Sequence, residues 1–401
     1  MQRRKRFVLI LLVLGAAAVP AGHAARPSVV LTSAPGEARA GTPFGVALSV
    51  RGTTARARIV ATSPLGTASV VARRTGRTQR ARLTVPGPGD WRLTARIGRR
   101  SYALATIDVR SAGADLVEPF RVSPSPDGSL VIANGRGHDV LAVRNGRLVR
   151  IAGNGRDGYE RDGVAATETA VGFPIDAAVA PDGDVYVVTA HRVRRIDAAT
   201  GLISTFAGTG VDGYAGDGGP AAAAQLAAPV AVAVNAHEDV FIAEGVGRVR
   251  YVDAHTGVIS TYAGLGRQES SGDGGPATAA GIDRPHGLAV GPDGALYVAD
   301  TYGGRVRRVD WFTKRITSVV SGLLLPVHMA AAPDGSILIA DTQRRSLRRI
   351  GPNGAETQVG SGFVEPSGVA VGPDGAIYVS DVDGRRVTRI DGAGRMTTVA
   401  R

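Results

Sequence analysis

A short sequence that returns at nearly fixed spacing limits this 401-residue chain to a repeat architecture. Pro-Asp-Gly occurs five times, Ala-His-Glu occupies a sixth place, and a proline stands seven residues before each copy. The copies begin at Pro126, Pro181, Ala236, Pro292, Pro333 and Pro373, with spacings of 55, 55, 56, 41 and 40 residues. Six units therefore share one register, and their spacing is typical of propellers.

Each unit is interpreted as four short strands separated by turns. The Asp-Gly pair suits the first hairpin, because Gly adopts positive φ and Asp hydrogen bonds its own backbone. The second strand is continuously apolar in every unit, as at 296–298, and therefore needs burial on both faces. Sheets stacked face to face around an axis provide that burial. We predict an all-β fold in which residues 114–401 form a six-bladed β-propeller.

Two motifs connect these units with a known repeat. Pro285–Val290 and Pro366–Val371 share the pattern Pro-x-Gly-(Val/Leu)-Ala-Val, and Tyr-Val-Ala-Asp-Thr follows at 297–301. On these residues the blades resemble NHL repeats, over all of 114–401. The last unit contains its own fourth strand at 396–400, so the sequence leaves open whether the ring closes by strand exchange or by blade contact alone.

The three long units carry glycine-rich insertions between the outermost strand of one blade and the innermost strand of the next. They occupy 152–163, 207–220 and 263–276. They resemble the Gly-Asp-Gly-Gly-Pro-Ala insertions of exported bacterial NHL-repeat proteins and of teneurin-type NHL propellers. We expect all three on one face, walling one side of the mouth. The predicted ligand-binding residues are Asp157, Asp162, Asp212, Tyr214, Asp217 and Asp273.

These aspartates raise the question of calcium. Hard cations take oxygen ligands, which Asp-Gly loops supply, but the ordered ligand spacing of a calcium loop is missing. Turn formation alone explains Asp next to Gly. We therefore predict no metal and no cofactor at the insertions.

Candidate chemistry lies on the innermost strands, which line the central channel of a propeller. Two residues after the leading prolines stand Arg121, Asp176, Ala231, Gly287, His328 and Gly368, and His286 precedes Gly287. Arg121, Asp176, His286 and His328 combine an electrophile, an acid and bases, and are the candidate catalytic residues. The alternative is that they are assorted residues of the mouth.

Pro285–Val290 is also similar to the histidine-bearing inner strands of peptide-amidating lyases and streptogramin lyases, which are propellers too. Their zinc sites use histidines from several blades. The equivalent positions here hold Phe120, Ile175, Val230, Val327 and Ser367. A three-histidine zinc site is therefore not supported.

A second ring of polar residues ends the apolar strands. Its members are Asn134, Thr189, Glu244, Asp300, Asp341 and Asp381. Such acids can bind a cation or a basic peptide, but a carboxylate at a strand end more often caps a turn by accepting backbone N–H groups.

Residues 27–110 read as a separate β-sandwich of about seven strands. Phe44 to Val50 and Trp91 to Ile97 alternate apolar and polar residues, and Pro- and Gly-rich turns separate them. The segments 40–44 and 85–91 resemble bacterial immunoglobulin-like accessory domains. This stretch has 14 Arg and 3 acidic residues, whereas residues 111–401 have 28 basic and 32 acidic ones. The positive electrostatic field of residues 27–110 would attract anionic envelope polymers or lipid headgroups.

The first 24 residues are typical of a secretory signal peptide. A basic stretch through Arg6 precedes an apolar run from Phe7 to Val19, and small residues precede a cleavage site after Ala24. The run is short for a membrane span, although an uncleaved anchor is the alternative. Export and the missing aromatic interleaving argue against nucleic acid as a partner. With no Cys, there is no disulfide, thiolate site or cysteine nucleophile.

Together these features predict an exported, non-enzymatic binding protein of the cell envelope. The loop face of its propeller would bind a protein, peptide or glycan, and its basic N-terminal domain would contact anionic material. The alternative is a propeller hydrolase or lyase with its active site in the axial funnel. Fold alone does not decide between them.

Overall fold

The computed structural model describes residues 116–159 and 161–401 in full and, within 28–110, the backbone of nine strands. The chain divides into two compact units, Met1–Ala114 and Asp115–Arg401. The predicted signal peptide lies outside the described residues. In the part that is described, no helix is long and apolar enough to cross a membrane.

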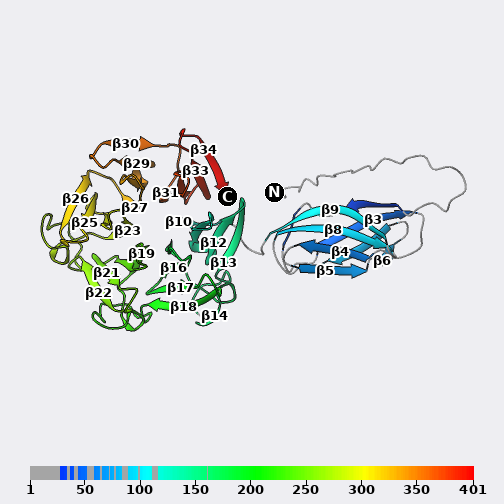
Figure 1. Cartoon of the computed structure of the whole chain (residues 1–401), viewed down its shortest axis with the longest axis horizontal. Coiled ribbons are helices and arrows are strands. Elements are labelled where there is room, and N and C mark those ends of the chain that lie inside the picture. Colours follow the sequence, from blue (N-terminus) through cyan, green and yellow to red (C-terminus); the bar gives the residue numbers. More distant parts are fainter. Residues whose placement is uncertain are drawn as a thin grey trace, which may run out of the picture. The chain divides into compact units, whose positions relative to one another are not determined.

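The second unit consists of six antiparallel sheets around one axis, each a meander with its first strand innermost (Figure 1). The prediction of a six-bladed propeller is thus confirmed. Blades 1 and 2 contain β10 (Pro119–Pro124), β11 (Leu130–Asn134), β12 (Asp139–Arg144), β13 (Arg147–Ala152), and β15 (Asp176–Val179), β16 (Val185–Thr189), β17 (Arg192–Ile196), β18 (Leu202–Ala207). Blades 3 and 4 contain β19 (Pro229–Val234), β20 (Val240–Glu244), β21 (Arg248–Val252), β22 (Ile259–Ala263), and β23 (Pro285–Val290), β24 (Leu296–Asp300), β25 (Arg305–Val309), β26 (Ile316–Ser321). Blades 5 and 6 contain β27 (Pro326–Ala331), β28 (Ile337–Asp341), β29 (Ser346–Ile350), β30 (Glu356–Val359), and β31 (Pro366–Val371), β32 (Ile377–Asp381), β33 (Arg386–Ile390), β34 (Met396–Ala400).

The core lies between neighbouring blades. The second strands β11, β16, β20, β24 and β28 are buried along their whole length, and β32 is buried over its last three residues. Burial on both faces explains why these strands are continuously apolar. The hydrophobic clusters each join two adjacent blades, as Val298 of blade 4 and Phe241 of blade 3 do.

The Pro-Asp-Gly turns form as predicted. In five blades the Asp carboxylate accepts the N–H of the residue two positions later, at 2.9 to 3.1 Å. Blade 3 lacks that Asp, and the Oδ1 atom of Asn235 accepts the N–H groups of His237 and Asp239 instead, both at 2.9 Å. Glu238 there takes the positive φ that Gly adopts in the other blades. One turn geometry is therefore built from two different sequences.

The ring closes through contacts between blades 1 and 6. Both blades are built from consecutive strands, so no strand is exchanged. Arg121 of β10 donates from Nη1 to the carbonyl oxygen and Oγ of Ser367 on β31, at 2.5 and 2.7 Å. Ser380 of β32 donates its hydroxyl to the carbonyl oxygen of Phe120, at 2.9 Å.

The three insertions take a different course from the one expected. Their Gly-rich segments run along the outer edge of the following blade instead of walling the mouth. β14 (Val164–Ala165) extends blade 2 by pairing with β18. Gly218 and Gly219 hydrogen bond with Ile259, and Gly274 and Gly275 with Ile316, in the same way. The outermost strand of a blade has a free hydrogen-bonding edge, and the insertions cover it.

Short 3-10 helices complete the connections. Three of them, η2 (Ala166–Glu168), η3 (Ala221–Ala223) and η4 (Ala277–Ala279), follow the edge segments of the insertions. Two others, η1 (Gly135–Gly137) and η5 (Thr342–Arg344), join the second and third strands of blades 1 and 5. Each insertion thus ends in a compact turn before the chain returns to the axis.

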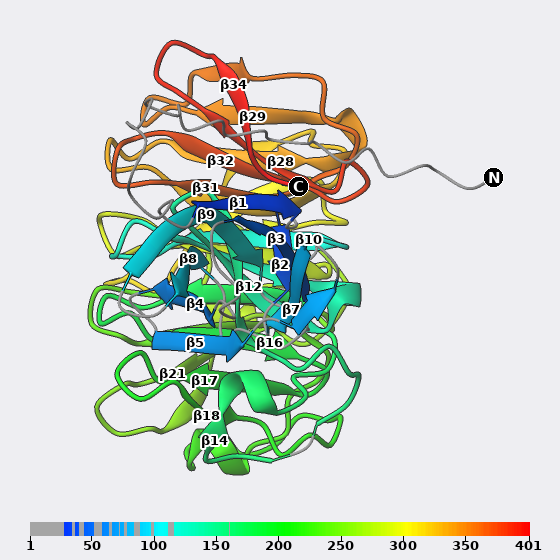
Figure 2. The same ribbon diagram turned by 90° about the vertical axis from the view of Figure 1, so that its right-hand side faces the viewer.

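The first unit contains two sheets in its described segments (Figure 2). One sheet has the order β1-β3-β7-β6, from β1 (Ser28–Ser33), β3 (Phe44–Arg51), β7 (Thr78–Leu83) and β6 (Arg73–Thr75). The other has the order β2-β9-β8-β4-β5, from β2 (Glu37–Arg39), β9 (Arg100–Arg110), β8 (Gly89–Ile97), β4 (Arg58–Ser63) and β5 (Gly66–Val71). Two β-sheets are consistent with the predicted sandwich, while its immunoglobulin-like character stays a prediction.

Candidate functional site

The innermost strands bring the predicted catalytic residues to the axis. Arg121, Asp176 and His328 occupy equivalent places on β10, β15 and β27, opposite Ala133, Val188 and Ala340 of the second strands. Their exposed fractions are 5%, 1% and 8%. Three charged or titratable side chains from blades 1, 2 and 5 are therefore buried around one axis.

Arg121 hydrogen bonds to backbone from four blades. Besides Ser367 of blade 6, its guanidinium donates from Nη2 to the carbonyl oxygens of His286 in blade 4 and Val327 in blade 5, both at 3.1 Å. Nη1 also donates to the carbonyl oxygen of Phe120 in its own blade, at 3.3 Å. Both terminal nitrogens are thus committed to the protein itself.

Asp176 uses both of its carboxylate oxygens. Oδ1 accepts the N–H of Ala177 at 2.8 Å, and Oδ2 accepts the N–H of Val232 on the inner strand of blade 3 at 3.0 Å. Burial raises the pKa of Asp176 to about 6, although the charge of Arg121 opposes this shift. The carboxyl group thus links blades 2 and 3, and its pKa lies closer to neutral pH than that of an ordinary aspartate.

The two axial histidines are held neutral. His328 accepts the N–H of Val369 from blade 6 at its Nδ1 atom, at 3.2 Å, so its proton resides on Nε2. Burial and the charge of Arg121 lower the pKa of His328 well below its usual range. Burial, Arg121 and Arg284 lower the pKa of His286 to about 4. Neither ring carries a charge at neutral pH.

The axial groups therefore tie the blades together. A general acid, base or electrophile needs a polar atom that can reach a substrate. Here Nη1 and Nη2 of Arg121, both oxygens of Asp176 and Nδ1 of His328 already bond to backbone groups, mostly of other blades. In the described part of the chain no three His, Asp or Glu side chains come together in a way that could hold a metal ion.

Three of the predicted ligand-binding aspartates pair with buried arginines on the third strands. Asp162, Asp217 and Asp273 bond to Arg194, Arg250 and Arg307, at 2.7, 2.5 and 2.8 Å. The three arginines are at most 1% exposed, whereas the aspartates are 32% to 37% exposed. Each aspartate thus fastens its insertion to the edge of the next blade.

Hydrogen bonds within the protein stabilise the charged forms of Asp217 and Asp162. Burial opposes ionisation of Asp217, but hydrogen bonds from Thr261 and Tyr214 and the charge of Arg250 lower its pKa. In Asp162 the same balance, with Thr205 and Arg194 as partners, also lowers the pKa. These carboxylates therefore stay ionised over the neutral range as parts of the clamp.

Tyr214, Asp157 and Asp212 lie farther out. The guanidinium carbon of Arg248 lies 3.5 Å from the ring centroid of Tyr214, whose hydroxyl donates to Asp217 at 2.9 Å. Asp157 and Asp212 are 78% and 68% exposed and face His138 and His191, at 3.6 and 3.3 Å. Of the predicted ligand-binding residues, these three leave the most surface accessible to a ligand.

Sequence reasoning missed Tyr159, the counterpart of Tyr214 in the first insertion. Its ring lies 4.3 Å from the guanidinium carbon of Arg192 and 4.6 Å from that of Arg194. The signal was available, because Asp-Gly-Tyr occurs in both insertions. Two insertions therefore present a tyrosine stacked on arginines, an arrangement that fixes the ring.

The second polar ring caps the incoming loops. Asp341 accepts the N–H groups of Leu324 and Leu325, and Asp381 accepts those of Val364 and Glu365. Asn134, Glu244 and Asp300 do the same for the loops before β10, β19 and β23. The interpretation as caps is confirmed for these five residues, whereas Thr189 donates its hydroxyl to the carbonyl oxygen of Arg192, at 3.5 Å.

Exposed apolar side chains occur in loops at the end of the propeller where the insertions begin, which we call the insert face. They lie in the connections that lead from one blade to the next and in the β24–β25 turn. Its members are Tyr159, Val211, Tyr214, Leu265, Tyr302, Leu324 and Val364, each 41% to 57% exposed. The insert face therefore offers aromatic and aliphatic contacts for a ligand.

Comparison with known proteins identifies the repeat. Residues 283–309, spanning β23 to β25, match the NHL repeat. Three strands of the fourth blade are thus similar to an NHL repeat. The NHL repeat-containing protein 2 of Gallus gallus is 26% identical over 234 residues, which cover 52% of this chain and 32% of that protein.

Other similarities are more limited. The chloroplastic protein SUPPRESSOR OF QUENCHING 1 of Arabidopsis thaliana is 31% identical over 101 residues, 24% of this chain and 9% of that protein. The chain thus spans about a third or less of these curated relatives. A gluconolactonase structure from Xanthomonas campestris matches with a TM-score of 0.50 and 14% identity, over 73% of this chain and 87% of that one. At that identity the likeness concerns the propeller fold alone.

Proposed function

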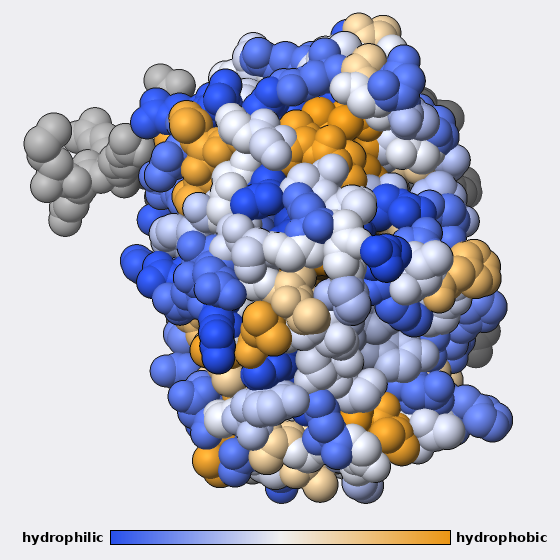
Figure 3. All heavy atoms as spheres, turned by 90° about the vertical axis from the view of Figure 1, so that its left-hand side faces the viewer, coloured by the Kyte–Doolittle hydropathy of each residue, from blue (hydrophilic) through white to orange (hydrophobic). Residues whose placement is uncertain are grey.

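We propose that the propeller is a binding module that holds a protein, peptide or glycan ligand at its insert face. The seven exposed apolar side chains in the loops at one end of the disc carry this proposal. The rim on the side of β25 and β26 is mostly hydrophilic, with apolar residues in separate groups (Figure 3). Exposed aromatic side chains are enriched at interaction sites.

The chemistry of the axis supports binding over catalysis. Nη1 and Nη2 of Arg121, both carboxylate oxygens of Asp176 and Nδ1 of His328 are engaged with backbone groups of the ring. Rigid stacking of Tyr159 and Tyr214 on arginines suits recognition, because little side-chain entropy is lost when a ligand binds.

The test uses ligands selected on the full-length protein from a displayed peptide library and from a glycan array. Tyr214→Ala and Tyr302→Ala are each expected to weaken the selected ligands at least tenfold. Phe312→Ala is the matched control, since Phe312 is 83% exposed but lies in the β25–β26 turn, away from the insert face. Equal losses for all three variants would refute the proposal.

The enzymatic alternative has its own readout. Hydrolysis of a panel of lactones, with glucono-1,5-lactone as the first probe, is measured for the wild type and for His328→Asn. Turnover that disappears in this variant would establish a catalytic axis. We expect no turnover above background from either protein.

We further propose that the chain is exported and that its basic first unit contacts anionic envelope material. The proposal rests on the signal-like residues 1–24 and on the excess of Arg over residues 27–110. N-terminal sequencing of the exported protein should begin at Ala25. Binding to phosphatidylglycerol vesicles should weaken steeply as salt rises, because surface charges are screened within about 10 Å at 0.1 M salt; salt-independent binding would contradict this role.

A further inference from the structure

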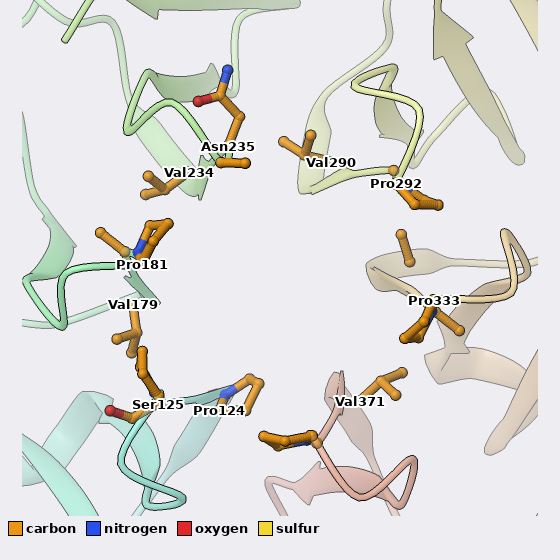
Figure 4. A pocket seen from close by; sticks show the side chains of 18 residues that line it. Pro124, Ser125, Val179, Pro181, Val234, Asn235, Val290, Pro292, Pro333 and Val371 are labelled. Atoms are coloured by element: carbon orange, nitrogen blue, oxygen red, sulfur yellow. The ribbon is translucent and has the colours of Figure 1, made fainter.

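A pocket of about 550 Å³ occupies the other end of the channel, where the first hairpin of each blade turns (Figure 4). Each blade contributes three consecutive residues, which end the innermost strand and begin the turn. We call this site the hairpin pocket. It is separate from the insert face, since it lies at the opposite ends of the same inner strands.

The lining of the hairpin pocket is apolar. Val179, Val234, Val290 and Val371 point into it from four inner strands (Figure 4). The turn prolines Pro126, Pro181, Pro292, Pro333 and Pro373 surround them and are exposed. The valines are half-buried, so they line the mouth without being part of the core. Because these valines and prolines remain in contact with water, binding of an apolar ligand group in the pocket is favourable.

The one side-chain amide in the lining is already engaged. Asn235 accepts two backbone N–H groups at Oδ1 and donates from Nδ2 to Asp239, at 2.9 Å. It therefore contributes shape and no free hydrogen-bonding group. The pocket therefore offers mainly apolar contacts, within a volume typical of ligand sites.

The rim of the pocket is acidic. Each of the five turn prolines is followed directly by an aspartate, and Glu238 lies in the corresponding turn of blade 3. In four blades an arginine pairs with the rim aspartate, at 2.5 to 3.8 Å. Among the residues that the structure describes, Asp182 and Glu238 of the adjacent blades 2 and 3 show no such pair within 4 Å. Both are exposed.

We propose that the hairpin pocket binds a basic peptide segment of a partner protein by enclosing one apolar side chain while neighbouring lysines or arginines face Asp182 and Glu238. The apolar pocket supplies the anchor, and the unbalanced carboxylates supply the charge complementarity. A neutral apolar molecule would use only the first of these, and an acidic peptide would be repelled.

Three labelled hexapeptides test this proposal by fluorescence anisotropy with the full-length protein. Acetyl-Lys-Lys-Leu-Leu-Lys-Lys-amide is expected to bind at least tenfold more tightly than its Ser-Ser counterpart and than its counterpart with Glu in place of Lys. Similar affinities for all three, or no binding of the Lys-Leu peptide at 1 mM, would overturn the proposal.

Variants locate the site. Ala331→Arg places a long cation into the pocket and is expected to lower the affinity of the Lys-Leu peptide at least tenfold. Asp182→Asn combined with Glu238→Gln, which leaves the apolar lining unchanged, is expected to lower it about fivefold at low salt. Glu168→Gln, an exposed carboxylate on η2, is the matched control. Unchanged affinity in both pocket variants would contradict the assignment.

Tyr214→Ala separates this inference from the proposed function. It should leave the affinity of the Lys-Leu peptide unchanged, because Tyr214 lies at the insert face. If Tyr214→Ala abolishes this binding, the peptide binds at the insert face and the hairpin pocket is not its site.

Discussion

Arg121 and Ser367 are 246 residues apart in the sequence and are joined by two hydrogen bonds, from Nη1 of Arg121 to the carbonyl oxygen and to Oγ of Ser367. These bonds cross the seam at which the first and last blades meet. The same guanidinium reaches the carbonyl oxygens of blades 4 and 5. Arg121 thus supports a ring that closes without strand exchange.

Replacing Arg121 should loosen the seam. Arg121→Met removes the charge that faces buried Asp176 and leaves four carbonyl oxygens without that donor. We expect the free energy of opening at β10 and β31 to fall by about 3–5 kcal/mol, measured by hydrogen exchange. Arg136→Met, at a side chain that is 76% exposed, should cost less than about 1 kcal/mol. Equal protection in the two variants would show that the axis does not hold the seam.

The pH dependence of stability should reveal Asp176. Its folded pKa of about 6 lies above the ordinary 3.8. Its contribution to stability is therefore fully present below about pH 4 and is lost as pH rises through about 6. The advantage of the wild type over Asp176→Asn should shrink by about 3 kcal/mol between pH 4 and pH 7. A constant difference would mean that Asp176 titrates normally in the folded protein.

The clamp on the second insertion should depend on Asp217. Asp217→Asn weakens the charge-assisted bonds to buried Arg250. The free energy of local opening of segment 214–220, measured by hydrogen exchange, should therefore fall by about 2 kcal/mol. Asp212→Asn, in the same insertion but 68% exposed, should change exchange there little. If exchange rises equally in both variants, the pair is not a clamp.

A pair of glycines tests how the third insertion starts. A Cβ at Gly264, where φ is +88°, would lie 2.3 Å from the carbonyl oxygen of Gly247, whereas a Cβ at Gly257, where φ is +68°, meets nothing within 4 Å. Both alanine variants strain the backbone. Gly264→Ala should lower the free energy of unfolding by about 2 kcal/mol more than Gly257→Ala does. Thermal melts that do not distinguish the variants would contradict the close contact.

The blades could be predicted because the turn and the apolar strand recur in each unit. Even the degenerate copy at Ala236 keeps its hairpin, since Asn235 supplies the missing hydrogen bonds. The course of the insertions could not be predicted, because their sequence does not show which free sheet edge Gly218 and Gly274 will meet.

The axial residues were placed correctly on the inner strands, but their role could not be read from their types. Whether Asp176 is a general acid or a link between blades depends on the N–H of Val232, a residue 56 positions away. The hairpin pocket was missed for a related reason. Its valines look like core residues of a strand, and only the ring reveals that four of them share one mouth.

The central claim is that the axial side chains hold the ring together through hydrogen bonds between blades. The most direct test is a pH titration of His328 by ¹⁵N NMR in histidine-labelled protein, with His328→Asn providing the assignment. We predict a neutral ring protonated at Nε2, with Nδ1 accepting the N–H of Val369, that does not titrate near pH 6.5. A ring that titrates near pH 6.5 with both nitrogens accessible to solvent would contradict the account.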